Sequence, residues 1–262
     1  MDWLSAVSPL SVLSGFVVGL LVGLTGVGGD SLMTPLLILV FGATATTAVG
    51  TDLLYAAITK SVGSIAHGRK QNVDWTIVGQ LAAGSLPGSV LTIAVMYLAG
   101  VRGDSSPRLI TITLGVALVL SAAAVLARPL LRRMMHFHAG ARRPLTALLT
   151  VITGFVLGVL VTISSVGAGA LGMTLLVILY PGVRLVRLVG TDVAHAVPLT
   201  LAAGMGHLLL GAIDWLLLLS LLIGSVPGIT VGSHMSARLP ERVLRPILAT
   251  ILVVVGIRML TK

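Results

Sequence analysis

Two glycine-rich, polar segments interrupt long apolar stretches of the sequence, and their residue types suit a small anion. The segments are Thr25–Ser31 and Ser164–Ala170. Glycine permits tight turns that expose backbone N–H groups, and a following helix directs its positive dipole end at the turn. Paired glycine breaks in two repeats mark a transport site. Glycines that only allow close helix packing are the alternative, but packing does not require a polar cluster, so we predict a site.

The predicted substrate-binding residues are the hydroxyl and glycine positions of these segments, with two threonines that follow glycine elsewhere in the chain. They are Thr25, Gly26, Gly28, Gly29, Ser31, Thr51, Ser164, Ser165, Gly167, Gly169 and Thr191. The hydroxyls add hydrogen-bond donors to those of the backbone.

Four ionisable residues, Asp30, Asp52, Lys60 and Asp192, lie within apolar segments. A charge at membrane depth is costly and usually functional. Asp52 and Asp192 each follow Gly-Thr. One hypothesis is a functional role, in proton coupling or in orienting the site. The other is that each aspartate caps a helix that restarts after the glycine. Lys60 either attracts an anion or, more simply, neutralises Asp52 two helical turns away. His195 is a candidate proton carrier close to the predicted site.

The other chemistry-bearing residues give no pattern of an enzyme or a metal centre. The six histidines have no metal-ligand spacing, cysteine is absent, and neither a Ser/His/Asp pattern nor a P-loop occurs. We therefore expect no catalytic residue, no metal, no cofactor and no ATP-driven step within this chain.

The composition places these residues in a membrane. Of 262 residues, 56% are hydrophobic and only 10% are charged, whereas soluble domains carry about 25% charged residues. The net charge of +9 lies mostly in short loops between apolar runs, which is typical of membrane proteins and argues against nucleic-acid binding. The expected partners are the lipid bilayer and a small anion, with protons as a candidate coupling ion and a homo-oligomer left open.

The sequence consists of two related halves. Residue pairs match at an offset of 139 near the start and 140 from Gly50 onward. The matches include Gly50–Asp52 with Gly190–Asp192, His67 with His207, Asp74 with Asp214, and Pro87 with Pro227. Such agreement predicts a duplicated fold. We assign residues 1–127 to the first membrane repeat, 128–143 to a basic cytoplasmic linker and 144–262 to the second membrane repeat.

The orientation of the halves depends on whether each glycine-broken segment crosses the membrane once or folds back as a hairpin. With hairpins, twelve Lys and Arg residues share the side of the central loop and four lie opposite, whereas single crossings divide them nine against seven. The positive-inside rule therefore favours hairpins. The predicted fold is an all-α polytopic membrane protein of two inverted repeats, each with a glycine-broken re-entrant or short-helix hairpin and three transmembrane helices.

Three stretches carry a family resemblance: Gly23–Gly29, Val49–Asp52 and the second-half echo Gly190–Asp192. With them the sequence resembles the sulfite exporter TauE/SafE family of membrane permeases, from about Leu10 to Leu260. The resemblance implies a multi-pass protein of a prokaryotic inner (plasma) membrane that moves sulfite, sulfonates or related organic acids. Asp30 departs from the glycine-rich turn that is usual in the family.

The predicted function is secondary transport, in the direction of export, of such a small sulfur-containing anion. The two turns would meet near the membrane midplane, and one group of helices would move against the other to alternate access. A passive anion channel is the alternative, because paired hairpins that meet at mid-membrane also occur in pores.

Overall fold

The computed structural model describes residues 9–25, 29–104, 108–135, 143–236 and 241–261, and within these ranges the chain is helical without β-strands. The elements are α1 (Pro9–Thr25), η1 (Gly29–Leu32), α2 (Met33–Leu39), α3 (Ala45–Arg69), α4 (Trp75–Leu98), α5 (Arg108–Met135), α6 (Arg143–Ser164), α7 (Ala170–Leu179), α8 (Leu185–Leu209), α9 (Trp215–Ser236) and α10 (Glu241–Leu260).

Five helices are long and apolar enough to cross a membrane. They are α4 and α8 over their whole lengths, and the segments Arg108–Ala127 of α5, Leu145–Ser164 of α6 and Trp215–Gly232 of α9. Large apolar side chains remain exposed along these helices, as expected for surfaces that face lipid. The predicted class, an all-α polytopic membrane protein, is confirmed.

Short polar signals set the starts of several helices. Thr44 caps α3 by accepting a hydrogen bond from the Thr47 N–H at 3.2 Å. Asp74 caps α4, and Asp214, its counterpart in the second half, accepts a bond from the Leu217 N–H at 2.9 Å at the start of α9. These side chains satisfy N–H groups that the first helical turn leaves unpaired.

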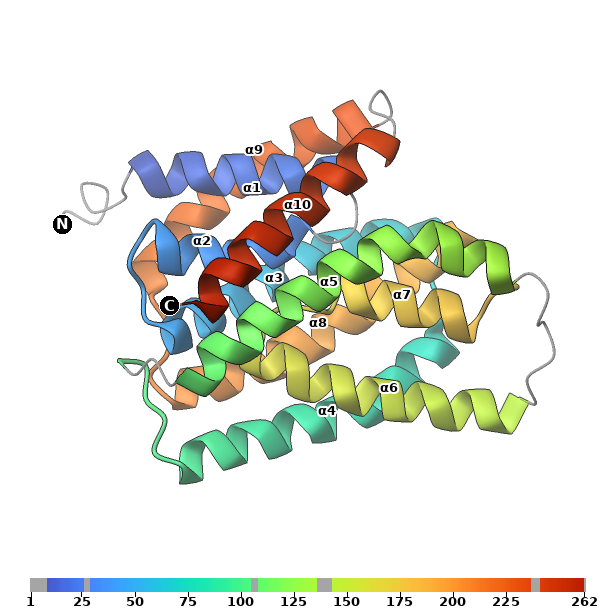
Figure 1. The fold of residues 1–262 in the computed structure, drawn as a ribbon, viewed down its shortest axis with the longest axis horizontal. Coiled ribbons are helices and arrows are strands. Elements are labelled where there is room, and N and C mark those ends of the chain that lie inside the picture. Colours follow the sequence, from blue (N-terminus) through green and yellow to red (C-terminus); the bar gives the residue numbers. More distant parts are fainter. Residues whose placement is uncertain (1–8, 26–28, 105–107, 136–142, 237–240, 262) are drawn as a thin grey trace.

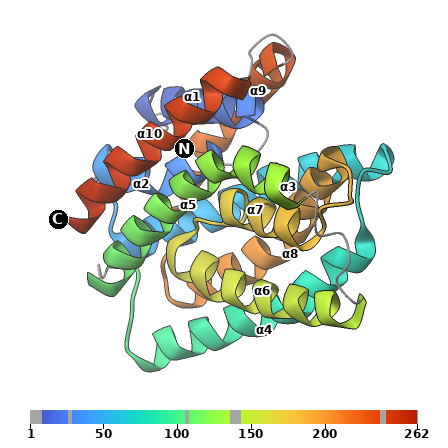
Figure 2. The same cartoon turned by 45° about the vertical axis from the view of Figure 1, so that its right-hand side comes forward.

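Helices of one half pack mainly on helices of the other half (Figures 1 and 2). α1 lies along α9 and α4 lies along α6, while α3 packs on α8 and α5 on α10. By the sequence offset, α1 corresponds to α6, α3 to α8, α4 to α9, and α5 to α10. In Figure 1, α5 and α10 run in opposite directions across the view, as do α1 and α6.

Glycines allow the backbones of the α1–α9 and α4–α6 pairs to touch. A Cβ atom on Gly15 of α1 would lie 2.9 Å from the Leu221 Cα of α9. In the second pair, a Cβ atom on Gly154 of α6 would lie 3.0 Å from the Leu81 Cα of α4, and closer still to the Leu81 carbonyl oxygen. Any larger residue would push the helices apart, so matched glycines produce matched crossings in the two halves.

A short helix follows each glycine-rich segment. α2 has seven residues and α7 has ten, or about 10 and 15 Å at 1.5 Å per residue. Neither reaches across a hydrocarbon core of about 30 Å. The end of α7 lies beside the N-terminal half of α6: the hydroxyl oxygens of Tyr180 and Thr150 are 2.7 Å apart. α6 and α7 therefore form a hairpin whose turn is the second glycine-rich segment.

Candidate functional site

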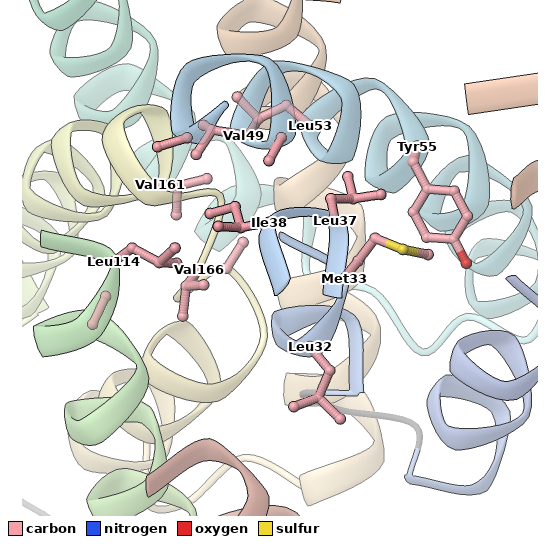
Figure 3. Close-up of a cluster of buried hydrophobic side chains, with 14 of the residues drawn as sticks. Leu32, Met33, Leu37, Ile38, Val49, Leu53, Tyr55, Leu114, Val161 and Val166 are labelled. Atoms are coloured by element: carbon pink, nitrogen blue, oxygen red, sulfur yellow. The ribbon is translucent and has the colours of Figure 1, made fainter. Parts of the chain in front are cut away.

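The turn between α6 and α7 lies in the main apolar core. Ser165 has a φ of 56° and Gly167 a φ of 118°, both in the left-handed region that permits a sharp change of direction. Val166 between them is fully buried and belongs to the same cluster as Leu37 and Ile38 of α2 (Figure 3). The turn of the α6–α7 hairpin therefore shares its apolar core with the short helix α2.

The two serines of this turn differ in their hydrogen bonding. The Ser164 hydroxyl donates to the Leu160 carbonyl at 2.7 Å and accepts from the Val166 N–H at 3.3 Å, so it holds the turn together. The Ser165 oxygen is buried and has no hydrogen-bond partner among the described residues. Of the two serines, Ser165 is therefore the one whose hydroxyl is not used within the described part of the chain. Gly169 precedes α7 as its N-cap residue.

Only part of the first predicted turn is described. Gly26 and Gly28 lie outside the described residues, as do the side chains of Thr25 and Asp30. Gly29 begins η1, and Ser31 lies within η1 with its side chain buried. The convergence of the two turns therefore stays a prediction.

Asp52 joins α3 to the short helix α2 of the first half. Its side chain is 1% exposed, and Oδ2 accepts hydrogen bonds from the Thr34 backbone N–H at 3.2 Å and from the Thr34 hydroxyl. Thr34 lies in the first turn of α2, where N–H groups lack helical partners. Because α3 runs unbroken from Ala45, Asp52 does not cap its own helix and instead supports the start of α2.

Asp192 occupies the corresponding place in the second half. Its side chain is 2% exposed, and a Cβ atom on Gly172 of α7 would collide with its Oδ1 atom. Only glycine at that position lets α7 approach the carboxylate so closely. Like α3, α8 is continuous through its Gly-Thr-Asp stretch, so Asp192 does not cap it. Each aspartate therefore joins a long helix to the short helix of its own hairpin.

The two predicted threonines contact the opposite half of the chain. The Asp214 N–H donates to the Thr51 hydroxyl at 3.0 Å, and the Asp74 N–H donates to the Thr191 hydroxyl at 2.9 Å. Both threonine side chains are fully buried. In this structure their hydroxyls hold the start of α9 against α3 and the start of α4 against α8.

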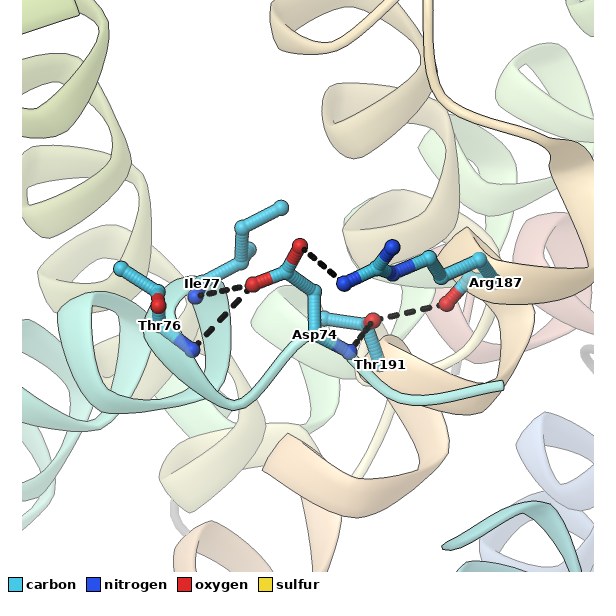
Figure 4. A network of polar contacts seen from close by, with 5 residues as sticks. All are labelled: Asp74, Thr76, Ile77, Arg187 and Thr191. Carbon is cyan, nitrogen blue, oxygen red and sulfur yellow. Dashed lines mark hydrogen bonds and ion pairs between the residues drawn. The ribbon is translucent and has the colours of Figure 1, made fainter. Parts of the chain in front are cut away.

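Asp74 is the centre of a polar network at the start of α4 (Figure 4). One carboxylate oxygen accepts from the Thr76 and Ile77 N–H groups, and the other lies 3.0 Å from the Arg187 guanidinium of α8. This ion pair could not be predicted from the sequence, although Asp74 has a repeat match in Asp214. Thr47 stands where the first half would carry the counterpart of Arg187.

His195 and Lys60 lie between the two halves. The His195 side chain on α8 is fully buried, and its Nε2 atom is 2.9 Å from the Ser85 hydroxyl oxygen of α4. Lys60 on α3 is half-buried and close enough to act electrostatically on the His195 ring. Ser85 was not predicted as a site residue, because nothing in its local sequence indicates a partner 110 positions away.

Apolar spans, buried aspartates and a turn inside the fold define the class: a multi-pass α-helical membrane transporter. The family model for the sulfite exporter TauE/SafE matches residues 11–259, and the chain belongs to this family.

Two relatives cover nearly the whole chain. "Probable membrane transporter protein YjnA" of Bacillus subtilis (strain 168) is 39% identical over 251 residues, which is 95% of this chain and 98% of the relative. "Probable membrane transporter protein YdhB" of the same organism is 30% identical over 242 residues, or 90% and 93% of the two chains. No solved structure matches the chain significantly.

Proposed function

We propose that this membrane transporter is a secondary carrier that exports a small sulfur-containing anion, such as sulfite, a sulfonate or a related organic acid. The observation that carries the proposal is the buried turn between α6 and α7, with left-handed backbone and a Ser165 hydroxyl that has no partner among the described residues. Family membership supports the substrate class. We place the protein in the inner membrane of a prokaryote, with residues 128–143 in the cytoplasm.

We further propose that the halves form an inverted repeat around this site. The reciprocal pairs α1–α9 and α4–α6 support this arrangement, as do the opposite directions of corresponding helices. The reciprocal bonds of Thr51 with Asp214 and of Thr191 with Asp74 provide independent support.

Alternating access then requires helices to move around the hairpins. The glycine-packed pairs α1–α9 and α4–α6 are suited to move as rigid units, because their backbones touch directly. Asp52 and Asp192 would keep each hairpin attached to α3 or α8 during that motion. The anion would bind between the hairpins and be exposed to each side in turn.

A ligand-stability screen tests the substrate class. Purified protein is heated in detergent with sulfite, sulfate, ethanesulfonate or acetate, and the thermal midpoint is measured. A ligand at one hundred times its Kd stabilises the folded state by about 2.7 kcal/mol. We expect sulfite or the sulfonate to raise the midpoint. No rise with either anion, or a rise with acetate alone, would contradict the sulfur-anion class.

Two serine variants test the site. Ser165→Ala should raise the Kd of the active anion, measured from the dependence of the midpoint on anion concentration, roughly tenfold or more, because hydrogen bonds to charged groups contribute about 1.5–3 kcal/mol. The matched control is Ser220→Ala on α9, whose buried hydroxyl bonds the Leu216 carbonyl of its own helix. Equal ligand affinity in both variants would remove Ser165 from the site. In vesicles, flux that rises without saturation and ignores a proton gradient would indicate a channel instead of a carrier.

A further inference from the structure

His195 joins α8 to α4 deep inside the fold. Its Nε2 atom is 2.9 Å from the Ser85 hydroxyl, and both side chains are fully buried. Its Nδ1 atom is also buried and has no hydrogen-bond partner in the part of the chain that the structure describes. Leaving a buried polar atom unpaired costs free energy, which a hydrogen-bond partner placed beside Nδ1 would recover.

The Ser85 end of this link lies at a special point of α4. Gly158 of α6 crosses α4 here, and a Cβ atom on Gly158 would lie 2.8 Å from the Ser85 Cα. Pro87 follows two residues later inside the helix. Because proline lacks an N–H, it interrupts the hydrogen-bond ladder of α4 and favours a bend there. A change in the protonation of the imidazole would therefore act on α4 next to the position where Pro87 interrupts its hydrogen bonds.

Few charged groups surround the ring. On α8 itself, Asp192 lies one turn earlier, against the α7 hairpin. Of the helices packed on α8, α4 and α7 carry no Asp, Glu, Lys or Arg. α3 and α6 carry Asp52, Lys60, His67, Arg69 and Arg143. Of these, Lys60 acts electrostatically on the ring.

The pairing of a histidine with a serine at these positions occurs in one half of the sequence only. At the position of His195 the first half has Tyr55, and at the position of Ser85 the second half has Ser225. The Ser225 hydroxyl donates to the Leu222 carbonyl of its own helix at 3.3 Å. A contact that the duplicated architecture required would be expected twice. The duplicated architecture therefore does not require a histidine at this position.

We propose that His195 binds a proton together with the transported anion. A protonated ring has two N–H donors, of which Ser85 can accept one. An anion beside Nδ1 accepts the other, and its negative charge offsets the repulsion between the protonated ring and the Lys60 ammonium group. The proton comes from water on the side where the anion enters and returns to water on the side where it leaves. This inference rests on the proposed function, and it makes transport of a monovalent anion electroneutral, so export removes acid with the anion.

Vesicles with a clamped membrane potential test the proposal, with radiolabelled ethanesulfonate as the probe because it stays ionised at neutral pH. With one proton per anion, one pH unit of gradient gives about tenfold accumulation on the alkaline side. We expect this for the wild type, whereas His195→Gln, which keeps an amide for Ser85, should not accumulate the anion. His207→Gln, at another buried histidine of α8, should accumulate like the wild type.

The outcomes separate the two proposals. Wild-type vesicles that do not exchange ethanesulfonate would overturn the proposed function for sulfonates. Exchange without accumulation in the wild type, or tenfold accumulation by His195→Gln, would overturn the role of His195 alone. If His195→Gln does not reach the membrane, Ser85→Ala tests the role of His195 instead. Ser85→Ala should shift the pH of half-maximal uptake, whereas the control Ser225→Ala should not. Equal pH profiles in those two variants would refute the link.

Discussion

Gly84→Ala is expected to push α4 and α6 apart. A Cβ atom on Gly84 would lie 2.7 Å from the Phe155 nitrogen and nearer still to the Val151 carbonyl oxygen, both backbone atoms of α6. Real Cβ atoms essentially never approach other heavy atoms within 3.0 Å. Backbone atoms cannot move aside as a flexible side chain can, so the helices must separate by about 1 Å or the core must deform.

Gly79→Ala on the same helix isolates the cost of that clash. A Cβ atom on Gly79 would meet nothing within 4 Å. Both variants gain the same helix propensity, about 1 kcal/mol over glycine. The difference between their stabilities therefore measures the clash at the α4–α6 crossing alone. Overpacking typically costs about 1–3 kcal/mol. At roughly 2–4 °C for each kcal/mol, Gly84→Ala should melt roughly 2–12 °C below Gly79→Ala.

The assay is the thermal midpoint of each purified variant, followed by fluorescence-detected size exclusion in one detergent. The heating rate is kept constant, because irreversible unfolding makes a midpoint depend on scan rate. Gly224→Ala on α9 provides a second measurement, since its Cβ atom would lie 2.8 Å from the Phe16 nitrogen of α1. Equal midpoints for Gly84→Ala and Gly79→Ala would refute the assignment of a tight backbone crossing.

The ion pair and the strained serine give two further outcomes. The Arg187 and Asp74 side chains are 43% and 23% exposed, so Asp74→Asn or Arg187→Gln should each lower stability by only about 0.2–1 kcal/mol. In a double-mutant cycle of thermal midpoints, the double variant should lose no more than either single variant; additive losses would show that the pair contributes nothing. Ser165→Gly should raise stability by about 1 kcal/mol by relieving the left-handed backbone, while weakening stabilisation by sulfite. Ser165→Ala keeps the left-handed strain and should therefore be less stable than Ser165→Gly. Equal thermal midpoints for Ser165→Ala and Ser165→Gly would contradict backbone strain at Ser165.

Two of the long helices were readable from the sequence because each coincides with an apolar run. The apolar run from Trp75 to Ala99 corresponds to α4, whose start is set by Asp74, and the run from Leu185 to Leu210 corresponds to α8. α5 continues beyond its apolar stretch to Met135. Leucine and arginine are good helix formers, so the helix outlasts the hydropathy signal there.

The contacts of the site were not readable, because they join residues distant in sequence. Nothing near Asp52 indicates that its carboxylate accepts hydrogen bonds from Thr34. Gly50 looked like a break in the helix, yet α3 passes through it unbroken. A Cβ atom there would lie 2.9 Å from the His207 Cβ, so this glycine serves close packing. Local sequence thus located the carboxylates but not their roles.

The pairing of α1 with α9 also bears on how the protein is made. α1 ends at Thr25 and α9 begins at Trp215, about 190 residues later. At about 5–20 residues per second, a ribosome needs roughly 10–40 s to cover that interval. During this time the glycine face of α1 contacts lipid or the insertion machinery instead of α9. α6 is synthesised soon after α4, so that pair can pack much earlier. Assembly would therefore begin in the middle of the chain, with the first helix synthesised among the last to be packed.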